Sequence, residues 1–176
     1  MYDVDIRVVK RREIDTIAPQ IHDVLLHAFQ SYAMDANLPF EAVGAITESV
    51  ETIKEDIQKK ICYIGTYNDR VIATARLEPI EEGRTGYLSR FGTHPDFVST
   101  GIGSSFIRFF EGQMALYGCE RILLHTASRA SRTVQFYYKN GFHVIGTDRK
   151  YGYIRVKMEK EIAAMPIIGA NVKKFQ

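Results

Sequence analysis

The amino-acid sequence predicts a mixed α/β fold around one hydrophobic core. In six or seven segments, apolar residues alternate with polar ones or form short runs, which is typical of strands. In about four other segments, apolar residues recur at every third or fourth position, which is typical of helices. The chain has 176 residues, of which 45% are hydrophobic, and no repeat or linker divides it. Folding a chain of this size into a single core buries roughly 70% of its extended surface.

The first predicted elements are one strand and two helices. Apolar side chains alternate with charged ones over residues 4–8, as in a half-buried strand. Helical spacing begins after Asp15, the predicted N-cap, and reaches about Tyr32. Residues 35–44 contain asparagine, proline and glycine without a period and predict a loop, after which Thr47 caps a second helix.

The middle of the chain predicts three strands. Residues 61–67 and 71–77 are strand-like, and the Asn68-Asp69-Arg70 segment between them is typical of a hairpin. A polar turn at residues 79–83 separates them from the third strand, residues 87–93.

The last part predicts two helices and three strands. Helical patterns over residues 106–117 and 131–140 are followed by Gly118 and Gly141, which permit the left-handed backbone of a helix end. The remaining segments predict strands at residues 122–126, 142–145 and 153–158.

Composition and charge exclude several classes of function. Lys plus Arg number 23 and Asp plus Glu 21, so the net charge of +2 is too small for a protein that neutralises many nucleic-acid phosphates. No segment approaches the roughly 20 apolar residues of a membrane span, and residues 1–5 lack a signal-peptide core. Cys62 and Cys119 lack the spacing of a zinc site. We expect a cytoplasmic protein without metal, nucleic acid or membrane as partner.

A glycine-containing turn between a strand and a helix is the most informative segment, reading Val98-Ser99-Thr100-Gly101-Ile102-Gly103-Ser104. Because Gly101 and Gly103 lack a Cβ, a phosphate can approach the backbone and meet the free N–H groups of the first helical turn. Phe106 replaces the third small residue of a dinucleotide fingerprint, and the lysine of a P-loop is missing. A nucleotide-binding module is therefore disfavoured.

Two motifs in this order resemble the core of the GNAT N-acetyltransferase superfamily over residues 87–142. The superfamily binds the pyrophosphate of acetyl-CoA with an Arg/Gln-x-x-Gly-x-Gly/Ala turn, whose two glycines match Gly101 and Gly103, whereas Val98 replaces the Arg or Gln. Downstream, Phe136-Tyr137-Tyr138-Lys139-Asn140-Gly141-Phe142 is similar to the superfamily's Leu/Phe-Tyr-x-x-x-Gly-Phe, a helix that ends beside the CoA thiol.

The resemblance implies one acetyltransferase domain over residues 1–160, with acetyl-CoA as cofactor. Its sheet is expected to be mixed and mostly antiparallel, and to splay open between the strands at 87–93 and 122–126. The pantetheine arm would bond to the backbone of Phe91, Gly92 and Thr93 in the manner of a strand. The pyrophosphate would lie on Val98, Ser99, Thr100, Gly101, Ile102, Gly103 and Ser104.

Acetyl transfer from a thioester to an amine needs a polarised carbonyl, a protonated leaving thiolate and a neutral amine. The resemblance implies that a backbone N–H of residues 91–93 polarises the carbonyl and that Tyr137 is the acid. Deprotonating an alkylamine of pKa about 10.4 costs about 4.6 kcal/mol at pH 7, so a base is useful. His125, with an ordinary pKa of about 6.5, is the first candidate base. Glu78 and a water chain are the alternatives.

The acceptor is expected to be a primary amine of a small molecule or peptide. By the resemblance, Phe29, Tyr32, Glu78 and Tyr87 border its site, with Tyr87 at a position where many members have glutamate. The alternative is a catalytically silent CoA-binding sensor or interaction module, because Val98, Ala130 and Tyr87 replace the superfamily's Arg/Gln, Asn and Glu.

The C-terminal segment is apolar. Residues 161–176 include a stretch at 162–169 that is broken only by proline and glycine. A frayed terminus is usually more polar, so we expect this tail to dock on its own domain or on a partner subunit, as in a homodimer.

Overall fold

The computed structural model describes residues 2–163 and contains a seven-stranded sheet with the strand order β1-β2-β3-β4-β5-β7-β6. Every neighbouring pair is antiparallel except β4 and β5, which are parallel. The predicted mixed, mostly antiparallel sheet is thus confirmed. The strands are β1 (Asp5–Val8), β2 (Cys62–Tyr67), β3 (Arg70–Ile80), β4 (Thr85–Thr93), β5 (Arg121–Ala127), β6 (His143–Lys150) and β7 (Tyr153–Glu161).

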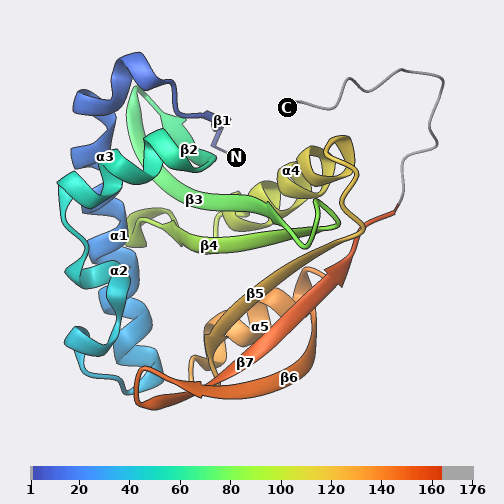
Figure 1. Cartoon of the computed structure of the whole chain (residues 1–176). Helices are drawn as coiled ribbons and strands as arrows, with labels where there is room; N and C mark the ends of the chain where they lie inside the picture. The colour runs from blue at the N-terminus through green and yellow to red at the C-terminus, as the bar shows by residue number, and fades with distance from the viewer. Residues whose placement is uncertain (1, 164–176) are drawn as a thin grey trace, which may run out of the picture.

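Helices cover both faces of the sheet (Figure 1). On one face, α1 and α3 pack against β2 and β3. On the other face, α4 and α5 share the main core with β3, β4 and β5. No helix within residues 2–163 is long and apolar enough to cross a membrane. The helices are α1 (Ile14–Ala36), α2 (Gly44–Thr47), α3 (Val50–Lys59), α4 (Ile102–Leu116) and α5 (Ser131–Lys139), with 3-10 turns η1 (Arg11–Glu13), η2 (Phe40–Ala42) and η3 (Pro95–Phe97).

The sheet splays open in its middle, as expected from the resemblance. Residues 85–87 of β4 pair with residues 121–123 of β5, and beyond Tyr87 the two strands diverge, as Figure 1 shows. The ladder between β3 and β4 also shifts register, which leaves Arg90 and Phe91 without partners on β3. Arg90 has a φ of 51°, so β4 carries a bulge where it leaves β5.

The turn chemistry predicted from the sequence is present. Asn68 and Asp69 have φ values of 49° and 59° and form the two-residue turn between β2 and β3. Gly118 and Gly141, at 79° and 87°, follow α4 and α5 in the left-handed conformation.

Four predicted helix boundaries were wrong. The first is the start of α4, which begins at Ile102 and not at residue 106, so residues 102–105 of the predicted turn form its first helical turn. Glu13, not Asp15, occupies the N-cap of α1, and Asp15 lies in the first turn, where its charge complements the helix dipole. The helix extends past Tyr32 to Ala36, because the small side chains at its end are buried, and η2 then occupies part of the predicted loop at 35–44. Thr47 ends α2, whereas Ser49 caps α3 by accepting a 3.1 Å hydrogen bond from the N–H of Thr52.

Several strands are longer than predicted. β3 reaches Ile80 and β4 begins at Thr85, so the polar turn is confined to the residues between them. β6 and β7 continue well beyond 142–145 and 153–158, because the turn at Tyr151 and Gly152 closes a long hairpin whose outer residues are polar and exposed. Most of the predicted apolar tail at 161–176 lies outside the described residues.

Candidate active site

Backbone edges that no strand covers lie where β4 and β5 diverge. The N–H of Ser128 donates to the carbonyl of Ile154 at 3.0 Å, and that of Ile162 donates to Glu120 at 2.8 Å. Because bonding alternates along an antiparallel pair, even-numbered residues of β5 bond to β7, and odd-numbered ones turn their N–H and C=O groups toward β4. The backbone of His125 therefore faces the diverging part of β4.

The open edge of β4 follows from the same alternation. The N–H of His94 donates to the carbonyl of Ile72 on the β3 side at 2.8 Å. Thr93, one residue earlier, therefore turns its N–H and C=O toward the open edge. The predicted backbone segment, residues 91–93, thus lies along the edge that β5 leaves uncovered.

Helix α1 bridges the two strands where they are apart. The Tyr32 hydroxyl accepts a 2.6 Å hydrogen bond from the N–H of Ala127 and lies 3.2 Å from Thr126 Oγ1, so it caps the end of β5. A Cβ on Gly92 would lie 3.4 Å from the ring of Phe29, which places Phe29 against β4. The two predicted acceptor-site aromatics, with ring centroids 5.6 Å apart, therefore contact both diverging strands.

The glycine turn forms the entry to α4. Gly101 is the N-cap of α4 with φ of 88°, and nothing lies within 4 Å of the position that its Cβ would take. The first intrahelical bond runs from the N–H of Ser105 to the carbonyl of Gly101, so the N–H groups of residues 102–104 have no helical partner. Val98 is 56% exposed and provides no side-chain donor. An anion at this turn would be held by backbone donors.

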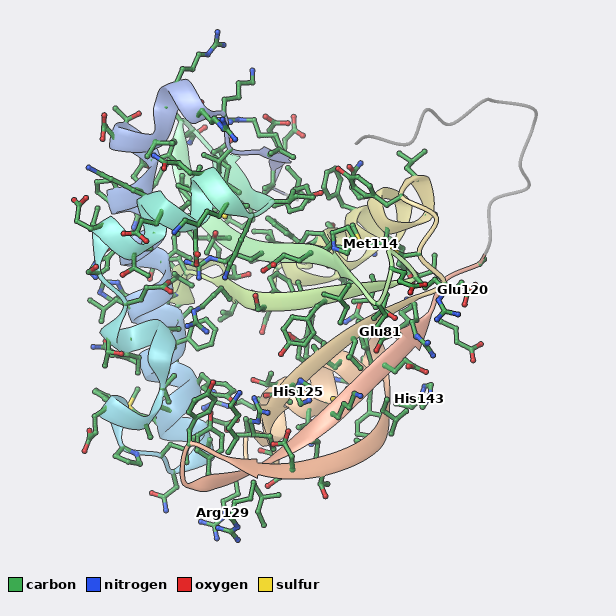
Figure 2. The ribbon with its side chains drawn as sticks, in the orientation of Figure 1. Glu81, Met114, Glu120, His125, Arg129 and His143 are labelled. Carbon is green, nitrogen blue, oxygen red and sulfur yellow. The ribbon has the colours of Figure 1, made fainter. Side chains whose placement is uncertain are left out.

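Strands β4, β5, β6 and β7 also bring together a row of four polar side chains. The Tyr87 hydroxyl on β4 lies 3.1 Å from Nδ1 of His125 on β5. Nε2 of His125 lies 3.6 Å from a carboxylate oxygen of Asp148 on β6. Arg155 on β7 donates two hydrogen bonds to that carboxylate, at 2.8 and 2.6 Å. Figure 2 labels His125 on the part of β5 beyond its pairing with β4.

Burial and neighbouring charges set the protonation states of His125 and Tyr87. Burial and the positive charges of Arg155, Lys157 and Lys150 lower the pKa of His125, while Asp148 acts in the opposite direction. A histidine whose pKa lies below 6.5 is neutral at pH 7 and can accept a proton. Burial raises the pKa of Tyr87, so its hydroxyl keeps its proton.

Tyr137, the predicted acid, lies on α5 in the core and is 7% exposed. Its ring packs against Phe136 and Phe142, with centroids 5.2 and 5.3 Å away. Burial raises its pKa well above 10, and no hydrogen bond within the described residues offsets the shift. The side chain is therefore a protonated phenol at neutral pH.

Glu78, the second candidate base, lies directly opposite Tyr87 in the ladder between β3 and β4. Its carboxylate is 3.8 Å from the ammonium group of Lys60. Glu78 is therefore next to Lys60, whereas His125 is the candidate base that contacts the Tyr87 hydroxyl.

A buried ion cluster supports the bulge of β4. Arg76 on β3 donates to both oxygens of Glu48, at 3.0 and 2.6 Å, and lies 2.6 Å from Asp56 on α3. Arg90 extends from the bulge toward the same Glu48, with Nε 3.5 Å from the carboxylate. The cluster ties α3 and the segment before it to the sheet beside the site.

A second polar cluster includes His94, which directly follows the predicted CoA-binding backbone of residues 91–93. Asp23, His27 and His94 place their ligand atoms within 4.8 Å of one another. The guanidinium of Arg70 lies 3.8 Å from Asp23 and 3.4 Å from His94 Nε2. Arg70 therefore already places a positive charge against this group.

Sequence reasoning missed Asp148 and Arg155. Both are charged residues in a strongly polar hairpin, and only the register that pairs them places Asp148 against His125. The signal available in the sequence was the alternation of charged residues at 148 and 150 and at 155 and 157.

The candidate site thus combines a splayed sheet, open strand edges and a glycine-capped helix. The model of the acetyltransferase (GNAT) family matches residues 26–142, and the chain belongs to this family. Acetyl-CoA is the cosubstrate of the family. A comparison with curated proteins finds no match.

Solved structures share the fold. The PaiA N-acetyltransferase of Thermoplasma acidophilum, in complex with coenzyme A, has a TM-score of 0.76 and 21% identity, over 90% of this chain and 99% of that one. The ribosomal-protein-S18-alanine N-acetyltransferase of Escherichia coli gives 0.71 and 14%, over 96% and 99%. A chimeric spermidine N-acetyltransferase with Vibrio cholerae sequence gives 0.67 and 15%, over 91% and 96%.

Proposed function

We propose that this protein transfers the acetyl group of acetyl-CoA directly to a primary amine of a small molecule or peptide. The observation that carries the proposal is the divergence of β4 and β5 just before the glycine-capped start of α4. The open backbone of residues 91–93 would bind the pantetheine arm, and the turn at residues 98–104 would bind the pyrophosphate. The unobstructed space at Gly101 fits such a group.

The side chains across the divergence would handle the protons. Bound acetyl-CoA supplies a thioester carbonyl for attack by the amine. Tyr87 would accept the proton of the amine at its hydroxyl oxygen and pass its own proton to Nδ1 of His125, 3.1 Å away. Asp148, held by Arg155, would stabilise the resulting imidazolium. Tyr137 would donate to the departing thiolate.

Calorimetric titration with acetyl-CoA tests this function first, with free CoA and ATP as controls. We expect micromolar binding of acetyl-CoA and CoA and none of ATP, followed by CoA release when amines are added. Absence of acetyl-CoA binding would overturn the proposal. Binding without turnover across a broad amine panel would favour the silent CoA-binding module, which the exposed Val98 at the pyrophosphate turn supports.

The assembly is a separate question. A homodimer built on the apolar segment at 162–169 stays a prediction. Sedimentation equilibrium at high protein concentration tests it, and a profile that fits only a monomer would contradict it.

A further inference from the structure

The carboxylates around His125 have basic partners, whereas two lysines there have no carboxylate partner among residues 2–163. This difference indicates which charge the acceptor carries. Side chains at 153, 155, 157 and 159 of β7 lie on the face of His125, since Met158 and Lys160 point to the opposite face, toward the core and α4. On β6, Asp148 shares the face of His125, and alternation places Lys150 there as well.

Each carboxylate near His125 on this face already has a basic partner. Asp148 is bound by Arg155, Glu78 lies 3.8 Å from Lys60, and Glu159 lies 3.6 Å from Arg121. Glu48 is held by Arg76 in the buried cluster. These carboxylates are therefore already neutralised and are poor partners for a second ammonium group on an acceptor.

The two lysines on the same face have no carboxylate partner in the described part of the chain, although the ammonium group of Lys150 lies 5.0 Å from the centroid of the Tyr151 ring. Lys157 is directly opposite His125 in the ladder between β5 and β7, at a position without ladder hydrogen bonds, where side chains lie closest. Lys150 acts on both His125 and Tyr87 as a positive charge. Neither ammonium group lies within 4.0 Å of a carboxylate of residues 2–163. Glu120, which also lacks an ion-pair partner in this part of the chain, is far from His125 at the other end of β5 (Figure 2).

Resting on the proposed function, we infer that Lys157 and Lys150 form an anion-binding subsite and that the acceptor is an amine that also carries a carboxylate. Such an acceptor would direct its anionic group to the β6–β7 hairpin while its amine meets Tyr87. A diamine or polyamine would instead bring a second positive charge against these lysines, which is unfavourable at this range.

Matched acceptors test the inference with the full chain. 4-Aminobutyrate, butylamine and 1,4-diaminobutane share a four-carbon chain and differ in the group opposite the amine, and the amide-capped dipeptides Ala-Glu and Ala-Lys repeat the contrast at a larger size. We expect the carboxylate-bearing member of each set to have at least a tenfold higher kcat/KM than its cationic counterpart. Higher salt should reduce this preference, because it screens exposed charges.

Variants separate an electrostatic subsite from a structural role. Lys157→Gln and Lys150→Gln should each raise the KM for the preferred carboxylate amine about tenfold, with the KM for acetyl-CoA and for butylamine changed less than twofold. Lys157→Glu should shift the preference toward the diamine. Arg149→Gln is the matched control, because Arg149 lies on the same strand but alternates to the opposite face.

Failure of the anion subsite and failure of the proposed acetylation give different results. Preference for the cationic amines, or an unchanged preference in Lys157→Glu, would overturn the anion subsite while leaving amine acetylation intact. Absence of turnover with all amines would overturn the proposed function itself, and the subsite with it.

Discussion

The Tyr87 hydroxyl and Nδ1 of His125 lie 3.1 Å apart, on two parallel strands that stop pairing at Tyr87 itself. The contact therefore spans the point where the sheet begins to open. By the resemblance, Tyr87 occupies the position of a glutamate in many members of the superfamily, and here it contacts a neutral histidine. A weakly acidic phenol cannot act as a base on its own, but next to His125 it can relay a proton.

Replacing His125 tests this relay. His125→Gln keeps a polar side chain but cannot accept a proton, so we expect kcat to fall roughly 100-fold. Because the pKa of His125 is lowered, the wild-type protein should be active at neutral pH and lose kcat/KM along an acid limb whose midpoint lies below that of an ordinary histidine. The variant should lack that acid limb. His143→Gln, on exposed β6, is the control, and a retained acid limb in His125→Gln would contradict the assignment.

Tyr137→Phe should lower kcat by a factor of about 10 to 100 and leave the KM for acetyl-CoA within twofold. The melting temperature should hardly change, since the ring packing against Phe136 and Phe142 is kept and the hydroxyl has no described hydrogen bond. Steady-state kinetics and thermal unfolding measure both. An unchanged rate and pH profile would exclude Tyr137 as the acid.

Replacing two glycines of α4 by alanine, one at its N-cap and one inside it, should change stability in opposite directions. Gly101 has a φ of 88°, so Gly101→Ala should destabilise the protein by about 1–2 kcal/mol and weaken CoA binding roughly tenfold. Gly112 lies inside α4 with nothing within 4 Å of its Cβ position, so Gly112→Ala should stabilise by about 0.5–1 kcal/mol and leave binding unchanged. Urea unfolding and calorimetry measure the pair, and equal CoA affinity in both variants would place the pyrophosphate elsewhere.

Restoring a basic residue at the turn should strengthen binding. Val98 is exposed, so Val98→Arg fits without repacking and adds a charge-assisted donor for a phosphate. We expect CoA affinity to rise about threefold to tenfold at low salt and the gain to shrink as salt is added. A gain that does not depend on salt would argue against a phosphate contact.

The buried ion cluster should dominate the stability of the bulge region. Arg76→Ala leaves Glu48 and Asp56 without their shared partner in a buried setting, and we expect a loss of about 3–5 kcal/mol in the free energy of unfolding. Arg149→Ala, an exposed residue without an ion pair among residues 2–163, should change it by less than about 0.5 kcal/mol. Denaturant titration compares the two, and similar losses would show that the cluster is energetically neutral.

The sequence predicts turns and helix ends well, because these depend on local backbone conformation and on the spacing of apolar residues. The glycines after α4 and α5 and the Asn68-Asp69 turn each occupy a left-handed backbone conformation, which few residue types adopt without strain. The splay followed from the family resemblance alone. Composition and periodicity contain no signal for two strands that separate.

The features that the sequence did not predict all depend on contacts between residues that are far apart in the chain. The end of α1 was missed because Ala33 and Ala36 are small residues whose burial is visible only in the fold. Asp148 was missed because its role depends on the register of a hairpin whose outer side chains are charged and exposed. Arg76 could be placed on a strand, but no local pattern indicates that its charge is buried against Glu48.

The short parallel pairing of β4 with β5 also shapes how the molecule holds together. Residues 85–87 and 121–123 are the ladder between the sheet's two halves, whereas β5, β7 and β6 pair along most of their lengths. Few backbone hydrogen bonds therefore connect the two halves directly, and the core shared with α4 holds them together. A ligand that bonds to both open edges would act as an additional strand between the two halves. Occupancy of the site would then couple the two halves more tightly.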